Sequence, residues 1–497
     1  MTNRQTTSSA LILAARGGVM VAALAAAGAA HASRCTDLAQ AFGSQLADVQ
    51  CFESTDLTTN NAATTPANDS LAGLPAFAFT PQTDRSVIAP VAGQRTPITK
   101  AVPGIQLNAR IASDPTGEAR FLLRLPDDWN GRLVVAGASG TRSEFNGDFA
   151  WSDYVVQQGY AYASQNKGVL NLQLTSVTGM GGPSDCRLNP ASPVYVHFYD
   201  DDPGQQFSRW RQYMIAAAKL ARQAVQSRYG HAARYTYAVG TSNGGYQVRR
   251  AIETAPELFD GGVDWEGTFV DAGAPNLLTD LPAAVLNLPD YVSSSYNASS
   301  TAAKNIRAAG YPPDLVIAST TSTASLWSTY SAAFWEVTLC QWQKRLDPTY
   351  DTYGAGTGTY NYEARLSVSD VGEEMIDFAT TGRIQRPLVT LAGTMDGLLP
   401  IDHHARAYAR KVRAQADDDG SSPYRLYEVQ NGNHIETYKA TFSQLELIEP
   451  HAQRAFDLLV QHVENGAPLP PDQCIPRGGE IADAPAQPGH CQALLAP

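Results

Sequence analysis

The segment Gly240-Thr-Ser-Asn-Gly244 constrains the fold of this 497-residue chain more than any other. It directly follows an apolar run, Tyr235-Thr-Tyr-Ala-Val239, that predicts a strand, and it leads into a predicted helix over 244–255. Its two glycines let the backbone turn sharply without the clashes of a Cβ atom. Such a strand–turn–helix unit exposes the hydroxyl of Ser242 at the C-terminal edge of a sheet, facing the positive end of the helix.

Strands and helices alternate along much of the chain. The predicted strands are 121–126, 132–136, 159–164, 235–239, 387–392 and 424–429, and the predicted helices are 207–229, 244–255 and 450–463. Gly230 is the expected C-cap of the first helix. This alternation predicts an α/β fold, with a mostly parallel sheet and helices on both faces. Residues 33–110, rich in Thr, Ala, Pro and Asn, predict only irregular and short β structure.

Residues 268–380 break this rhythm. They contain Ser- and Thr-rich stretches and three of the seven tryptophans, Trp327, Trp335 and Trp342. Because a structureless loop of this length is improbable inside a compact domain, the segment predicts an inserted cap, or lid, domain. The tryptophans either shape an apolar substrate slot or form the core of the cap itself.

The first 32 residues have the layout of a secretory signal peptide. Arg4 and Arg16 precede a run of small and apolar residues that ends in the cleavage pattern Ala30-His-Ala32. Arg16 leaves the apolar run shorter than the ~18 residues that a membrane span needs. The sequence therefore predicts a secreted or periplasmic protein with no membrane contact after cleavage.

Six cysteines agree with export, because disulfides form in oxidising compartments. Short loop closure favours the pairs Cys35–Cys51 and Cys474–Cys491, which leaves Cys186 and Cys340 for each other. A zinc site is disfavoured, since no CxxC pair occurs and only Cys491 has a histidine beside it, His490.

The balance of charges excludes some classes of protein. The chain carries 48 acidic and 36 basic side chains, a net charge of −12, and this argues against nucleic acid as a partner. The combination of 43% apolar and 17% charged residues is atypical of a disordered chain. The oligomeric state is left open.

A serine nucleophile needs a base, usually a histidine oriented by a carboxylate, and in this kind of sheet the chain order is serine, acid, histidine. His434 follows the predicted strand 424–429, and Asp396 follows strand 387–392 by a few residues. Asp402 lies beyond Pro400 and is better placed as an N-cap. His197 stays open as a second histidine near the site.

An acyl-transfer site also needs donors for the oxyanion. The backbone N–H of Asn243 is one candidate. The other should come from the loop Gly137-Ala-Ser-Gly140, with Ser139 or Gly140 as the donor.

Several motifs occur in one order: Leu125-Pro-Asp-Asp-Trp-Asn-Gly131, Gly240-Thr-Ser-Asn-Gly-Gly245, Pro256-Glu-Leu-Phe-Asp-Gly261, Leu346-Asp-Pro348, Asp396 and Asn433-His434. The order resembles the tannase and feruloyl-esterase family of secreted α/β-hydrolases, and Ser-Asn-Gly-Gly is similar to the 3-hydroxybutyrate-oligomer hydrolases. The resemblance covers roughly 115–470. It implies a cap inserted after the nucleophile unit and a triad of Ser242, Asp396 and His434.

The chain departs from the tannase pattern at two positions. Thr241 and Ile435 stand where the family has cysteines that form a disulfide beside the triad. The Asp-rich calcium loop of many feruloyl esterase caps is not evident either. We therefore expect no metal and no cofactor, and Asp347–Asp351 is the only faint metal candidate.

These observations predict a secreted serine esterase that cleaves aromatic or hydroxyalkanoate esters, including oligomers, through an acyl-enzyme. A secreted serine peptidase of the same fold and a non-catalytic polymer-binding protein are the alternatives. The predicted organisation is a signal peptide (1–32), an N-terminal extension (33–110), a catalytic core (111–267 and 381–470), a cap (268–380) and a disulfide-stapled tail (471–497).

Overall fold

The computed structural model describes residues 34–64, 96–140, 142–170, 207–319, 322–350, 359–415, 422–487 and 490–492, with short pieces between 172 and 197. The predicted signal peptide, residues 1–32, lies outside them. Among the described residues, no helix combines the length and apolar character that crossing a membrane requires.

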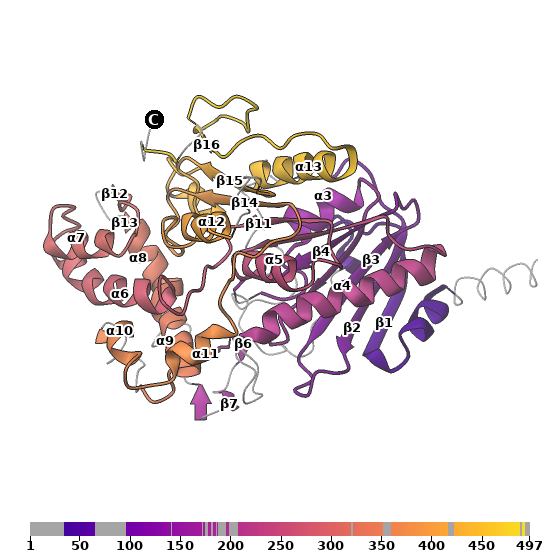
Figure 1. The fold of residues 1–497 in the computed structure, drawn as a ribbon, viewed down its shortest axis with the longest axis horizontal. Helices are drawn as coiled ribbons and strands as arrows, with labels where there is room; N and C mark the ends of the chain where they lie inside the picture. Colours follow the sequence, from indigo (N-terminus) through magenta and orange to yellow (C-terminus); the bar gives the residue numbers. More distant parts are fainter. Residues whose placement is uncertain are drawn as a thin grey trace, which may run out of the picture.

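A ten-stranded sheet forms the centre of the molecule (Figure 1). In spatial order its strands are β1 (Leu46–Ser54), β2 (Gly104–Ile111), β3 (Arg120–Pro126), β5 (Ala161–Gln165), β4 (Arg132–Gly137), β10 (Tyr235–Thr241), β11 (Gly261–Trp265), β14 (Leu388–Gly393), β15 (Tyr424–Val429) and β16 (Gln473–Ile475). The pairs from β1 to β5 are antiparallel, and those from β5 to β16 are parallel. The exchange of β4 and β5 beside an antiparallel β3 is the strand order of the α/β-hydrolase fold, which confirms the predicted fold class.

Helices cover both faces of this sheet. α4 (Ser208–Tyr229), α5 (Asn243–Thr254) and α12 (Ala405–Arg413) pack on one face, and α3 (Asp153–Val156) and α13 (Glu449–Asn465) pack on the other. Side chains of β4 alternate between the two layers: Leu133 and Val135 join the first, and Val134 and Ala136 join the second. Gly230 ends α4 in the left-handed conformation, with φ 79°, as predicted.

The N-terminal region differs from its prediction. Instead of short β pieces, it supplies the nine-residue β1 and the eight-residue β2 to the main sheet. The sequence of β2, Gly-Ile-Gln-Leu-Asn-Ala-Arg-Ile, alternates apolar and polar residues with the period of a strand. Composition hid this local pattern, because the Thr- and Pro-rich residues around it dominate the average.

The structure contains three disulfides, Cys35–Cys51, Cys186–Cys340 and Cys474–Cys491. They are the pairs that the loop-closure argument favours. The last of them starts in β16, so the segment predicted as a tail contributes a strand to the sheet as well.

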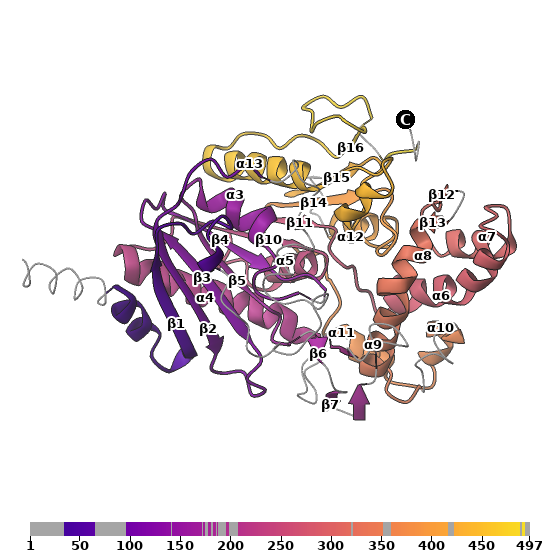
Figure 2. The same cartoon turned by 180° about the vertical axis from the view of Figure 1, so that it is seen from behind.

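Residues 268–380 form a mainly helical group beside the sheet (Figures 1 and 2). Its elements are α6 (Leu277–Ser293), α7 (Thr301–Ala308), β12 (Val316–Ala318), β13 (Thr323–Ser325), α8 (Leu326–Tyr330), the π-helix η5 (Ser331–Trp335), α9 (Glu336–Leu346), α10 (Tyr362–Arg365) and α11 (Val371–Ile376). Their apolar side chains, with Trp327, Trp335 and Trp342 buried among them, form one hydrophobic cluster together with α/β-core residues such as Trp210 and Tyr246. We call this group the inserted segment.

One buried carboxylate ties the inserted segment to the core. Asp280 of α6 lies 2.8 Å from His403 Nδ1 and 3.3 Å from His404 Nε2, both just before α12. Burial by itself would raise the pKa of Asp280, but its contacts with the two histidines outweigh burial and lower that pKa. The hydrogen bond to Asp280 raises the pKa of His403, whereas burial lowers the pKa of His404. The contact therefore favours the protonated form of His403, which forms an ion pair with Asp280.

This ion pair makes stability depend on pH. The raised pKa of His403 means that its contribution is complete below its unfolded pKa of about 6.5 and disappears as the pH rises through the folded value. The lowered pKa of Asp280 means that its contribution is present above about pH 4 and disappears in acid. We expect His403→Gln to lower the free energy of unfolding by roughly 1 kcal/mol at pH 5.5 and by less at pH 8.5.

Thermal unfolding of both proteins at the two pH values measures this difference. His231→Gln, at an exposed histidine in the connection between α4 and β10, is the control and should show no such dependence on pH. A deficit of His403→Gln that is the same at both pH values would contradict the assignment.

Candidate active site

Ser242 lies at a strained turn between β10 and α5. Its backbone angles, φ 59° and ψ −120°, fall in a region that non-glycine residues rarely adopt. The Ser242 N–H donates to the carbonyl of Trp265, and the Ser242 carbonyl accepts from Tyr246 in the first turn of α5. These bonds fix the turn on both sides, as the Gly-x-Ser-x-Gly pattern predicts.

The turn is possible because two backbones meet without side chains between them. A Cβ atom on Gly244 would lie 2.6 Å from the carbonyl oxygen of Gly137 at the end of β4. A Cβ atom on Gly240 would lie 2.4 Å from the carbonyl oxygen of Gly244. Glycine at these positions lets the start of α5 lie directly against the loop that follows β4.

Asp396 and His434 are in direct contact. Asp396 follows β14, His434 follows β15, and Nδ1 of the imidazole lies 2.9 Å from Asp396 Oδ2. The other carboxylate oxygen accepts the backbone N–H groups of Leu398 and Leu399, both at 2.7 Å. Both side chains are buried. These bonds fix the Asp396 carboxylate and hold the imidazole in one orientation.

Ser242 and His434 line one cavity of about 270 Å³. Asn243, Ser139 and Gly140, the oxyanion candidates, also line it. The inserted segment contributes the apolar side chains Leu277, Ala332, Ala333, Phe334, Val337 and Trp342. The structure thus brings the predicted nucleophile, base and oxyanion groups to one apolar cavity. Of the three tryptophans, Trp342 lines this cavity among the described residues, and all three belong to the hydrophobic cluster that the inserted segment shares with the α/β core.

Hydrogen bonds distinguish the two oxyanion candidates in the loop after β4. The N–H and hydroxyl of Ser139 both donate to Asn146 Oδ1, at 2.9 and 3.0 Å. The N–H of Ala138 donates to Gln247 of α5 at 3.0 Å. The Gly140 N–H has no partner within the described part of the chain. This pattern favours Gly140 over Ser139 as a donor toward the cavity.

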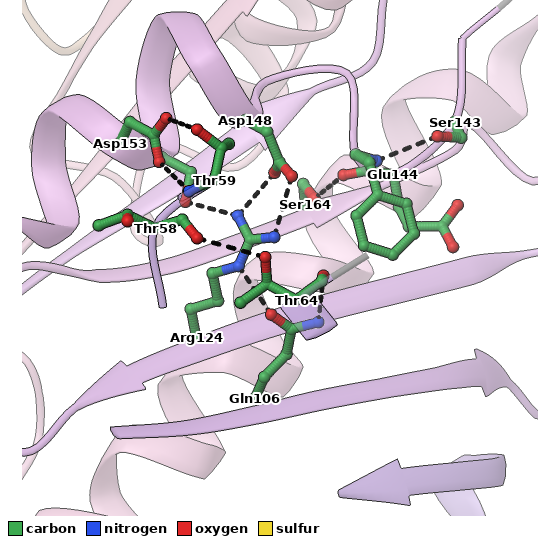
Figure 3. A network of polar contacts seen from close by, with 12 residues as sticks. Thr58, Thr59, Thr64, Gln106, Arg124, Ser143, Glu144, Asp148, Asp153 and Ser164 are labelled. Atoms are coloured by element: carbon green, nitrogen blue, oxygen red, sulfur yellow. Dashed lines mark hydrogen bonds and ion pairs between the residues drawn. The ribbon is translucent and has the colours of Figure 1, made fainter. Parts of the chain in front are cut away.

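A buried ion pair lies in a polar network further along this stretch of the chain (Figure 3). Arg124 of β3 and Asp148, in the π-helix η4 (Asp148–Ser152), are joined at 2.6 and 3.0 Å, and neither side chain is exposed. Arg124 also donates to Ser152 in η4 and to Gln106 of β2. Because η4 ends the stretch that begins at Gly137, this pair fixes the far end of the oxyanion loop to the sheet. This pair was not evident in the sequence.

Glu266 is a residue of the site that the sequence analysis missed. It directly follows β11, and its Oε2 lies 3.3 Å from His434 Nδ1. Its other oxygen accepts the Gly393 N–H at 2.9 Å. The strand-end rule that selected Asp396 would have selected Glu266 too, had Gly261-Gly-Val-Asp-Trp265 been recognised as a strand.

The other histidine candidates lie elsewhere. His434 is the only histidine among the described residues that line the cavity. His197, left open by the sequence, is fully buried, and burial together with the nearby Arg345 lowers its pKa to about 3, so it is neutral at neutral pH.

The carboxylates also bear on metal binding. One group of possible ligands occurs among the described residues, namely Glu266, Asp396 and His434, whose donor atoms all lie within 4.8 Å of one another. Asp396 and His434 are already joined to each other by a hydrogen bond, and Glu266 lies beside them. Asp347, the faint candidate from the sequence, is ion-paired with Arg365 at 2.6 Å.

Parts of the chain are similar in sequence to proteins of known family. The 3HB-oligomer hydrolase family model matches residues 295–492, which include Asp396 and His434 but not Ser242. A D-(-)-3-hydroxybutyrate oligomer hydrolase of Burkholderia thailandensis is 32% identical over 108 residues, 20% of this chain. The matched part spans 15% of that relative's length.

Solved structures are similar over more of the chain. Feruloyl esterase B of Aspergillus oryzae is 15% identical, covers 85% of this chain and 87% of its own, and has a TM-score of 0.46. The tannin acyl hydrolase of Aspergillus niger is 14% identical, covers 88% of each chain, and has a TM-score of 0.42. The resemblance to the 3-hydroxybutyrate-oligomer hydrolases that the motifs indicated is confirmed by the family-model match and the curated relatives.

The close approach at Gly244 gives a test of the turn. Gly244→Ala would press a Cβ atom against the Gly137 backbone, which cannot rotate away as a side chain can. We expect a loss of roughly 3 kcal/mol or more in unfolding free energy, seen as a lower melting temperature. Gly140→Ala is the control, since no heavy atom lies within 4 Å of its added Cβ. Equal melting temperatures for the two variants would be inconsistent with this packing.

Proposed function

We propose that this protein is a serine carboxylic-ester hydrolase with Ser242, His434 and Asp396 as its triad. The observation that carries the proposal is the 2.9 Å contact of His434 with Asp396 at the cavity that the strained Ser242 lines. The similarity to proteins named 3-hydroxybutyrate oligomer hydrolase and feruloyl esterase supports the same chemistry.

The proposed reaction is acyl transfer in two steps. Ser242 Oγ attacks the ester carbonyl while Nε2 of His434 takes its proton, and His434 then returns the proton to the leaving alcohol. Asp396 keeps the imidazole proton on Nδ1 and stabilises the imidazolium. The N–H groups of Asn243 and Gly140 bind the oxyanion, and water releases the acid by the reverse sequence.

The cavity suggests which esters are cleaved. Its lining is mostly aliphatic and aromatic, but Arg142, beside the oxyanion loop, also lines it and is the only permanently charged side chain there among the described residues. A guanidinium in an apolar cavity suits a carboxylate. We therefore favour hydroxyalkanoate oligomers that carry a free carboxyl end over neutral aromatic esters.

The remaining parts of the proposal concern the inserted segment and export. Residues 268–380 act as a cap that closes the apolar side of the cavity, since Phe334, Val337 and Trp342 line it opposite the strand ends. The three disulfides suit an oxidising compartment, which supports secretion or a periplasmic location.

Turnover of a p-nitrophenyl ester tests the reaction. Ser242→Ala should lower kcat by about 10⁴-fold or more while the melting temperature stays close to that of the wild type, because only the nucleophile is removed. Thr241→Ser, a conservative change at the neighbouring cavity residue, should keep activity. Wild-type turnover no greater than that of Ser242→Ala would refute the esterase proposal.

A second experiment tests the role of Arg142. Arg142→Gln should raise KM for a 3-hydroxybutyrate trimer by roughly 10-fold, as expected for the loss of a charge-assisted hydrogen bond. The methyl ester of the same trimer lacks the carboxylate and should be cleaved equally well by both proteins. Arg307→Gln, at an exposed cation of α7, is the control. An equal rise in KM for the free acid and the methyl ester would exclude recognition of the carboxylate.

A further inference from the structure

Two carboxyl groups, not one, face the same ring nitrogen of His434. Asp396 Oδ2 lies 2.9 Å and Glu266 Oε2 lies 3.3 Å from Nδ1. The two acids come from different strand ends, Asp396 from the loop after β14 and Glu266 from the end of β11. A single Nδ1–H donates well to one acceptor at a time, so the second carboxyl has no evident role in a triad of three residues.

The surroundings of the two acids differ. Asp396 receives two backbone N–H bonds on the oxygen that does not face His434, whereas Glu266 receives one, from Gly393. Glu266 is buried, and its φ of 50° shows that the backbone is strained to bring it there. Asp396 is therefore the acid with more backbone N–H donors.

Charge repulsion then decides the state of Glu266. Burial and the nearby charge of Asp396 raise the pKa of Glu266 well above its usual range, and Glu436 acts in the same direction. Glu436 of the 3₁₀-helix η7 (Glu436–Ala440) is itself buried, and burial raises its pKa to about 7. His434 is the facing group that can become a cation. Burial and the neighbouring carboxylates therefore both favour the protonated form of Glu266.

We propose that Glu266 is a second acid of the triad, a positioning residue that holds His434 together with Asp396 and replaces Asp396 as the ionised acceptor when Asp396 is neutral. This inference rests on the proposed triad. With both acids present, protonated Glu266 packs against the Asp396–His434 pair without adding a second negative charge. When Asp396 is neutralised, the repulsion is gone, Glu266 releases its proton to solvent, and its carboxylate accepts the Nδ1–H.

A double-mutant cycle tests this proposal. In a triad with a single acid, replacing the aspartate by asparagine lowers kcat by about 10⁴-fold. Here we expect Asp396→Asn to lose only about 10- to 100-fold, and Glu266→Gln alone to lose less than about 10-fold. The double variant Asp396→Asn/Glu266→Gln should fall by about 10⁴-fold. Losses that simply add, with Asp396→Asn already near 10⁴-fold, would overturn the proposal.

The pH profile separates this role from a merely structural one. In Asp396→Asn, activity requires ionised Glu266, which burial still disfavours, so kcat/KM should rise with pH over a higher range than in the wild type. The double variant should lose this recovery at alkaline pH. An identical profile for the single and double variants would show that Glu266 only fills space.

Two measurements keep the result independent of the choice of ester. The rate at which a p-nitrophenyl phosphonate labels Ser242 reports activation of the nucleophile without turnover. The infrared band of protonated carboxylic acids at pH 7, to which Glu436 also contributes, should be weaker in Glu266→Gln than in wild-type protein. If this loss of intensity is seen but no ester is cleaved and no label is taken up, the proposed function fails while the protonation of Glu266 stands. If the band of Glu266→Gln equals that of the wild type, the second-acid role fails.

The same three side chains could alternatively be metal ligands, and chelation distinguishes the two. Dialysis against EDTA should leave the labelling rate of Ser242 unchanged. A rate that falls with EDTA and is restored by Zn²⁺ would show that Glu266 serves a metal and would overturn the proposal.

Discussion

The close contact of two backbones, at Gly137 after β4 and Gly244 in α5, is the constraint on which the site depends. A side chain at Gly244 would lie against the Gly137 carbonyl, so the helix could not begin where it does. Because it begins there, Ser242 takes its strained conformation and Gln247, one turn along α5, reaches the Ala138 N–H. Nucleophile and oxyanion loop are thus positioned by one packing contact rather than by separate devices.

The second organising feature is a cluster of carboxyl groups at the C-terminal ends of parallel strands. Asp396, Glu266 and Glu436 are buried near one another, with His434 as the facing ring. Backbone N–H groups stabilise the charge of Asp396, while the other two acids have raised pKa values. The cluster tolerates burial because few of its members are ionised at once. On the far side of the oxyanion loop, the buried Arg124–Asp148 pair provides the rigid support that this arrangement needs.

Rules that depend on local sequence predicted much of this. Ser242, Asp396 and His434 each follow an apolar run, so strand ends could be found and their C-terminal edge inferred. Glu266 was missed because β11 is five residues long and begins with two glycines, so its strand character comes from its neighbours β10 and β14. The choice between Ser139 and Gly140 depends on Asn146, whose bond to Ser139 no spacing rule predicts. The Asp280–His403 pair likewise joins residues more than a hundred positions apart.

Chemistry and specificity arise from different stretches of the chain. The proposed catalytic groups lie on sheet ends and loops of the α/β core, whereas Phe334, Val337 and Trp342 of the inserted segment shape the apolar side of the cavity. The 3HB-oligomer hydrolase match begins at residue 295 and includes that apolar wall together with Asp396 and His434. Arg142 lies outside the match, earlier in the sequence, next to the oxyanion loop. If the apolar wall of the inserted segment selects an aliphatic acyl chain and Arg142 selects a free carboxylate, specificity requires that the two stretches keep a fixed position relative to each other. The Asp280–His403 contact, the Cys186–Cys340 disulfide and the Trp335–Gly397 hydrogen bond all join the inserted segment to the core. Substrate selection of this kind would therefore depend on contacts that lie apart from the reacting atoms.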